Sequence, residues 1–168
     1  MTAVAVALSA IALNAASVDW QFSELTSAAN SPYSLTGYTA YLFTADTWEG
    51  AKISATLFNS AADSAALTYA SLGNGAMDQW RTGTQTADNA SSGNYYIVLS
   101  NGKDYVASGA LSATAYSSAQ ESHTVATWSI AANQTPLAQS DFKAIPEPTS
   151  GLLLLLGMAG LALKRKRA

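Results

Sequence analysis

Short stretches in which apolar and polar residues alternate occur along much of the chain, and they predict β-strands. The first is Val18–Ser23, in which Val18, Trp20 and Phe22 would share one face. The last is Thr124–Ile130, which alternates over its whole length. Because side chains alternate between the two faces of a strand, each pattern predicts a strand with one face in an apolar core.

Further β-prone runs lie between these two strands. They are Gly37–Phe43, Tyr95–Leu99 and Asp104–Ala107. Asn101 and Gly102 separate the last two runs, and Asn-Gly between β-prone runs is the strongest short-range signal for a hairpin. Leu111–Tyr116 is compatible with either an edge strand or a loop.

A helical period interrupts the β-prone runs between residues 47 and 72. The residues at helical spacing are Trp48, Ala51, Ala55 and Phe58. Asp46 or Thr47 would cap the start of this helix, and the Ala-rich stretch Ala61–Leu72 would continue it or form a second one. Residues 76–93 have no clear period, although Trp80 would anchor them to the core.

The pattern as a whole predicts a mainly β, single β-sandwich-like domain with one helical excursion. A small α+β fold is the alternative. The domain would cover residues 17–133, and a polar linker would follow at 134–145. Two helices are expected to flank it, a signal-type helix at the N-terminus and a transmembrane helix at the C-terminus.

The C-terminal segment, residues 146–168, has three parts in a fixed order. Pro146, Glu147 and Pro148 come first, and an uncharged Leu-rich run follows at 151–163. The segment then ends in a basic cluster formed by Lys164, Arg165, Lys166 and Arg167.

This order predicts a transmembrane helix over residues 149–164. The apolar run spans only roughly 20 Å as a helix, against about 30 Å for a bilayer core. The long cationic side chains that follow can reach the interface, and they suit the cytoplasmic side. A surface-lying amphipathic helix is the alternative, but the apolar residues occupy every side of the helix.

The same order resembles the PEP-CTERM protein-sorting signal of Gram-negative bacteria. The resemblance implies recognition of Pro146, Glu147 and Pro148 by an exosortase, a membrane-embedded cysteine protease that cuts near this motif. It also implies a precursor in the inner membrane and a product at the cell surface or outside the cell. An ordinary stiff linker before a tail anchor is the alternative reading of the three residues.

The N-terminus predicts a secretory signal peptide over residues 1–16. An uncharged stretch rich in Ala, Val and Leu leads to Asn14, Ala15 and Ala16, and signal peptidase would cut after Ala15 or Ala16. The usual basic residues before the apolar stretch are missing, so we expect a misassigned start codon or a clipped sequence. The Sec translocon would carry the chain across the membrane. A short buried helix is the alternative.

Composition narrows the class of protein. Residues 17–144, which are the predicted domain and most of its linker, have four basic residues and ten carboxylates, a net charge of −6, which argues against nucleic acid as a partner. The chain has no cysteine, so disulfides, thiolate metal ligands and a cysteine nucleophile are excluded.

No residue stands out as catalytic. The single histidine, His123, reads as a polar residue at the start of the last strand, with a general base or a lone metal ligand as the alternative. No nucleophile elbow, zinc motif or calcium loop occurs. We therefore expect no catalytic residue, metal or cofactor, and a structural or adhesive role. The eight tyrosines and four tryptophans leave open a carbohydrate-binding module associated with exopolysaccharide, and an enzyme ranks third.

Overall fold

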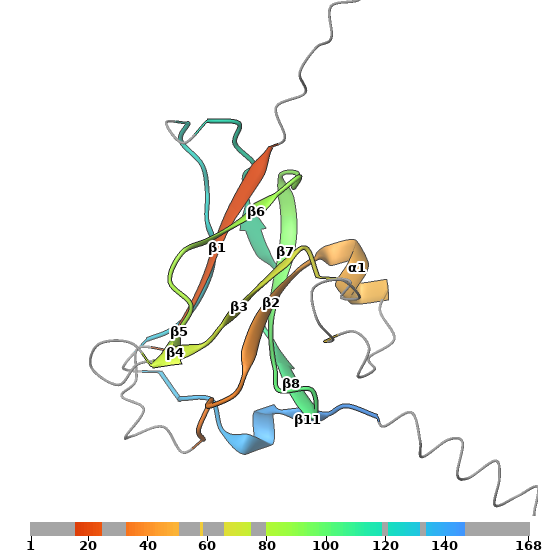
Figure 1. The fold of residues 1–168 in the computed structure, drawn as a ribbon, viewed down its shortest axis with the longest axis vertical. Helices are drawn as coiled ribbons and strands as arrows, with labels where there is room; N and C mark the ends of the chain where they lie inside the picture. Colours follow the sequence, from red (N-terminus) through yellow and green to blue (C-terminus); the bar gives the residue numbers. More distant parts are fainter. Residues whose placement is uncertain are drawn as a thin grey trace, which may run out of the picture.

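The computed structural model describes residues 16–24, 33–50, 58, 66–74, 80–118, 121–131 and 134–146. Within these residues the chain is mainly β, with one short α-helix, and its strands form two sheets (Figure 1). The prediction of a mainly β domain with a helical excursion is therefore confirmed at this level.

The first sheet is built around β1 (Ser17–Glu24). Its strand order is β10-β1-β5-β4, where β10 is Ala126–Ile130, β5 is Trp80–Arg81 and β4 is Gly73–Asn74. β10 runs parallel to β1, whereas β5 and β6 (Gln85–Asp88) pair antiparallel with its other edge. The alternation predicted for β1 is confirmed: Val18, Trp20 and Phe22 are fully buried, and Glu24 is the fourth residue on that face.

The second sheet is built around β7 (Gly93–Ser100) and β2 (Thr39–Thr44). Its order is β11-β8-β7-β2-β3, where β11 is Lys143–Ala144, β8 is Asp104–Ala107 and β3 is Thr68–Ser71. β9 (Leu111–Ala113) pairs with the first residues of β7, on the edge that β8 joins further along.

The predicted hairpin is confirmed between β7 and β8. The side-chain oxygen of Asn101 accepts hydrogen bonds from the backbone amides of Lys103 and Asp104, at 2.9 and 3.0 Å. Gly102 has a φ of +83°, in the left-handed region that favours glycine. The two residues thus supply both the capping acceptor and the unusual backbone conformation that this turn needs.

The main core lies between the two sheets. The first sheet contributes Val18, Trp20 and Phe22, and the second contributes Leu42 and Ile97, all fully buried. Burial of each such side chain contributes about 1.5–3 kcal/mol to folding. Trp80 belongs to the same cluster, so its predicted role as a core anchor is confirmed.

A second, smaller cluster covers the outer face of the second sheet. α1 (Ala45–Gly50) lies against β2 and β7, on the side away from β1 in Figure 1. Phe43 and Val98 from the sheet pack with Phe58, and Trp48 of α1 lies against them. Because β2 is covered on both faces, it is buried at four consecutive positions and shows no alternation.

The predicted helix over residues 47–72 is found at its start, in α1, and the prediction is wrong at Thr68–Ser71, which forms β3. Thr44 caps α1 by accepting a hydrogen bond from the Thr47 amide at 3.2 Å, so the cap lies before Asp46 and Thr47. Part of the Ala-rich stretch forms β3, which pairs antiparallel with β2. Long-range pairing with a buried strand outweighs the local helix propensity of alanine here. Residues 51–57 and 59–65 lie outside the described residues.

The segment expected as a polar linker packs on the domain instead. Leu137 and Ile145 are buried, and the 3-10 helix η2 (Gln139–Asp141) lies between them. The Leu137 amide donates to Glu24 Oε1 of the first sheet at 3.2 Å, whereas β11 pairs with β8 of the second. This segment therefore ties the two sheets together.

The two flanking helices fall outside the described residues. Residues 1–15 of the predicted signal peptide and the predicted transmembrane helix at 149–164 both lie there. Of the helices that the structure does describe, none has the length and apolar character needed to cross a bilayer. The transmembrane helix thus remains a prediction from the sequence.

Candidate functional site

The predicted sorting motif begins directly after Ile145, the last buried residue that the structure describes. The Ile145 amide donates to the Lys103 carbonyl at 2.8 Å, beside the turn of the β7–β8 hairpin. Ile145 is buried and Pro146, the next residue, is exposed. Glu147, Pro148 and the basic cluster at 164–167 lie outside the described residues.

The predicted signal cleavage site borders the first strand. The carbonyl of Ala16 accepts a hydrogen bond from the Ala90 amide at 2.9 Å. Ser17 then pairs with Tyr116 through two backbone hydrogen bonds. Ala15, the other predicted cleavage residue, lies outside the described residues.

His123 belongs to a polar cluster on the outer face of the first sheet. Its Nε2 lies 3.0 Å from Asp19 Oδ2, and its ring stacks on Tyr116 with the ring centres 4.1 Å apart. Asp19 Oδ1 accepts hydrogen bonds from the hydroxyls of Tyr116 and Thr86, each at 2.8 Å. Burial opposes the charge on Asp19, but hydrogen bonds to its carboxylate outweigh burial and lower its pKa.

Both ring nitrogens of His123 face acceptors, so the protonated ring donates two hydrogen bonds. Nδ1 lies 2.9 Å from the Glu121 carbonyl, which can only accept, and Nε2 faces the ionised Asp19 carboxylate. The contact with the Glu121 carbonyl has the largest effect and that with Asp19 the next. Both raise the pKa of His123 and favour the imidazolium. Both ring nitrogens are therefore engaged in contacts within the domain. The sequence placed His123 at the start of the last strand but gave no signal for its partner.

A second polar cluster lies under the C-terminal segment. The hydroxyl of Tyr38 donates to Asp104, and the hydroxyl of Tyr33 lies 2.6 Å from that of Tyr38. Phe142 packs on both tyrosine rings, at ring-centre distances of 4.7 and 5.1 Å. The pKa of Tyr38 is raised, mainly by burial of its hydroxyl and then by the hydrogen bond to the Asp104 carboxylate. Tyr38 therefore stays protonated and donates its hydrogen bond to Asp104. This contact has a structural role.

An aromatic groove of about 480 Å³ lies on the outer face of the second sheet. Trp48 of α1, Tyr96 of β7 and Tyr105 of β8 line it and are each half-buried. The ring centre of Trp48 is 6.3 Å from that of Tyr96 and 5.8 Å from that of Tyr105. The charged residues that also line the groove are Glu49, Asp141 and Lys143.

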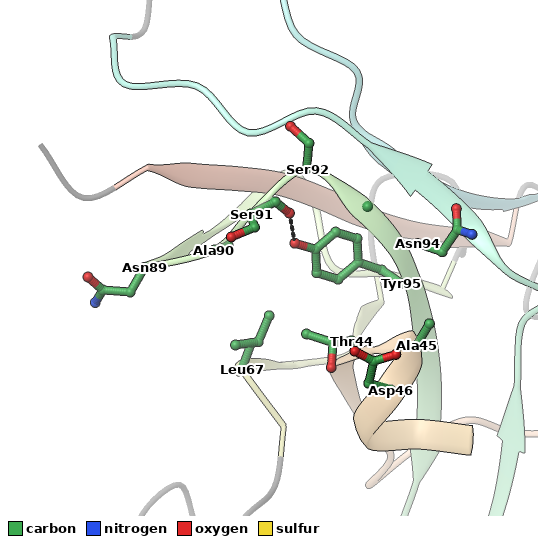
Figure 2. Close-up of a pocket in the computed structure, with 11 residues that line it drawn as sticks. Thr44, Ala45, Asp46, Leu67, Asn89, Ala90, Ser91, Ser92, Asn94 and Tyr95 are labelled. Atoms are coloured by element: carbon green, nitrogen blue, oxygen red, sulfur yellow. Dashed lines mark hydrogen bonds between the residues drawn. The ribbon is translucent and has the colours of Figure 1, made fainter. Parts of the chain in front are cut away.

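A second hollow, of about 430 Å³, lies at the start of α1 (Figure 2). Figure 2 shows residues 89–94 on one side and Thr44, Asp46 and Leu67 on the other. Tyr95 also lines this hollow, but it is almost fully buried and its hydroxyl donates to the Ser91 carbonyl. Small polar side chains and backbone therefore make up most of its wall.

The tyrosines and tryptophans divide between core and surface. Tyr69 is the most exposed of the tyrosines that the structure describes, at 47 %, and it lies on the edge strand β3 outside both hollows. Among the described residues, no three His, Asp or Glu side chains converge as a metal site would require.

The fold and the tail together define a class of protein, a β-rich domain that carries a C-terminal protein-sorting motif. Residues 144–167 match the family of the PEP-CTERM protein-sorting motif. The match begins at Ala144, inside β11, so the motif and the folded domain overlap. Comparison of the chain with curated proteins and with solved structures found no match in either case. The motif implies a protein that is exported and processed at the membrane of a Gram-negative bacterium, with an exosortase as processing partner.

Proposed function

We propose that this protein is a non-enzymatic structural or adhesive component of the bacterial cell surface or extracellular matrix. The observation that carries the proposal is the position of the sorting motif, whose match begins at Ala144 in β11 and whose Pro146 directly follows the buried Ile145. Sorting would then deliver a folded domain. The contacts of His123 support the non-enzymatic part, because both ring nitrogens of the single histidine face acceptors within the domain.

The route would use both termini. The Sec translocon would export the chain, and signal peptidase would cut after Ala15 or Ala16. The helix at 149–164 would hold the precursor in the inner membrane, with Lys164, Arg165, Lys166 and Arg167 on the cytoplasmic side. An exosortase would then recognise Pro146, Glu147 and Pro148 and release or transfer the domain.

The test is to change Pro146, Glu147 and Pro148 to alanine, or to delete the exosortase. Either change should leave uncut protein in the inner membrane, measured by fractionation and intact mass. Pro136→Ala is the matched control, because Pro136 precedes the motif and its loss should leave processing unchanged. Normal release of the triple variant would contradict the sorting proposal.

A carbohydrate-binding module is the second candidate. The half-buried aromatic side chains at the groove favour it, because sugar-binding proteins commonly stack pyranose rings on Trp and Tyr. Exopolysaccharide would then be the partner. Binding that disappears when the groove residues are changed would distinguish this candidate from a purely structural role.

A further inference from the structure

We propose that the groove between α1 and strands β7, β8 and β11 is a binding site for uncharged pyranose residues of a polysaccharide. This inference rests on the carbohydrate-binding candidate and names its site and ligand class. The groove volume, about 480 Å³, falls within the range of small-molecule sites.

The aromatic wall of the groove supplies the apolar contact. The ring planes of Trp48 and Tyr96 are inclined to each other by 35°. Tyr105 meets Trp48 at 72°, close to edge-to-face. The C–H groups on one face of a pyranose carry partial positive charge and are attracted to the negative face of an aromatic ring. The three rings thus line one groove at different inclinations to one another.

These side chains are fixed before any ligand arrives. Trp48 packs on Phe43 with ring centres 5.3 Å apart, and Tyr105 stacks on Phe58 at 6.0 Å. The hydroxyl of Tyr96 donates to Glu49 Oε1 at 2.7 Å. A ligand that binds to such a fixed surface loses less free energy to ordering of side chains.

The charged residues of the groove match sugar hydroxyl groups. Glu49 and Asp141 offer carboxylate acceptors, and Lys143 offers an ammonium donor. Asp141 is held in place because its Oδ2 accepts a hydrogen bond from the Ala138 amide at 2.8 Å. Lys143 is opposite Tyr105 in the β11–β8 register, so donor and ring lie side by side.

The balance of charge selects the class of sugar. Two carboxylates and one ammonium give the groove a net charge of −1, which disfavours polysaccharides of uronic acids. Aromatic rings with carboxylates could also hold a quaternary ammonium group. A quaternary ammonium group cannot accept a hydrogen bond from Lys143, whereas a sugar hydroxyl can accept from Lys143 and donate to the carboxylates, so a neutral sugar fits the groove better.

The hollow of Figure 2 is a weaker candidate for the same ligand. Its one aromatic side chain, Tyr95, is only 2 % exposed and cannot offer a ring face. Asp46 is its one charged residue among those that line it. It therefore lacks the combination of half-buried aromatic rings and both donors and acceptors that the groove has.

The experiment measures binding to the full chain, purified in a detergent that has no sugar headgroup. Neutral hexose oligosaccharides are compared with an oligouronate of equal length and with phosphocholine, by titration calorimetry. A neutral oligosaccharide should bind best. Trp48→Ala and Tyr96→Ala should each weaken that binding by about tenfold or more, as for aromatic residues at the centre of an interface.

Tyr69→Ala is the matched control, since Tyr69 is an exposed aromatic residue of the same sheet outside the groove. The affinity of Tyr69→Ala for the neutral oligosaccharide should stay within about twofold of the wild-type value. If circular dichroism shows that Trp48→Ala unfolds the domain, Glu49→Gln serves as the test variant instead. Its affinity for the neutral oligosaccharide should fall by about threefold to tenfold.

Three outcomes would overturn the proposal. They are the absence of binding to every neutral oligosaccharide, tighter binding of the oligouronate or phosphocholine, and binding that the groove variants leave unchanged. None of these outcomes affects processing at Pro146–Pro148, so failure of this inference is distinguishable from failure of the sorting proposal.

Discussion

His123 Nε2 donates to Asp19 Oδ2 at 3.0 Å, although 104 positions separate the two residues in sequence. The contact joins the segment that leads into β10 to β1, the central strand of the first sheet. The side chains of His123 and Asp19 are 18 % and 15 % exposed. The pair therefore holds together two parallel neighbouring strands at the surface, outside the apolar core.

The first prediction concerns the dependence of stability on pH. The pKa of His123 is raised by folding, so its contribution is fully present below about pH 6.5 and is lost as the pH rises through the folded pKa. His123→Gln should remove this loss. Urea unfolding between about pH 5 and 9 should show a smaller decline for the variant than for the wild type.

Asp19 acts at the other end of the pH range. Its pKa is lowered by folding, so its contribution is present above about pH 3.8 and is lost as the pH falls through the folded pKa. Asp19→Asn should reduce the acid sensitivity and also bring the pKa of His123 closer to its ordinary value, as measured by NMR titration. An unchanged His123 titration in this variant would contradict the pairing.

The second prediction concerns the mature N-terminus. The amide of Ala90, which is buried, donates to the carbonyl of Ala16. Cleavage after Ala16 would remove this acceptor and leave a buried donor unpaired, at a cost of about 1–3 kcal/mol. We therefore expect cleavage after Ala15. Intact mass and N-terminal sequencing of the exported protein should find Ala16 as the first residue, and a start at Ser17 would contradict this.

The third prediction concerns the C-terminal segment. Ile145 is buried against the outer face of the second sheet, so Ile145→Ala should lower the free energy of unfolding by about 2 kcal/mol or more. Ala144→Ser is the control, because Ala144 is exposed and its change should stay within about 0.5 kcal/mol. A true linker would leave both variants as stable as the wild type in chemical denaturation.

The fourth prediction concerns the β7–β8 turn. A methyl group at Gly102 would meet no atom within 4 Å, so Gly102→Ala tests backbone conformation alone. The φ of +83° should cost about 1–2 kcal/mol with alanine. Gly109→Ala is the matched control, since that site is equally open and has no positive φ. Thermal unfolding should therefore separate the two variants, and equal midpoints would argue against the left-handed turn.

Features with a local cause could be predicted from the sequence. The alternation of Val18, Trp20 and Phe22 marks a strand with one face in the core, and that pattern needs no knowledge of the partners. Asn101 and Gly102 specify their turn through their own side chain and backbone. The sorting motif is also local, because its three parts are recognised by their order along the chain.

Features that depend on partners could not be predicted in this way. β2 is buried on both faces, which hides its period, and β3 forms in an Ala-rich stretch only because β2 provides a ladder for it. The short strands β5 and β6 have too few residues to show a period, and β1 aligns them. Residues 134–145 are polar enough to be read as a linker. However, a few apolar residues, Leu137 and Ile145 among them, are buried against the domain and hold the segment in place.

By itself, the sequence determined the strands with one open face, the hairpin and the C-terminal sorting motif, because each is encoded within a few neighbouring residues. Only the tertiary structure decided that His123 meets Asp19, that the segment before Pro146 closes across both sheets, and that Trp48, Tyr96 and Tyr105 line one groove. These residues are far apart along the chain, and packing of the two sheets and α1 brings them together.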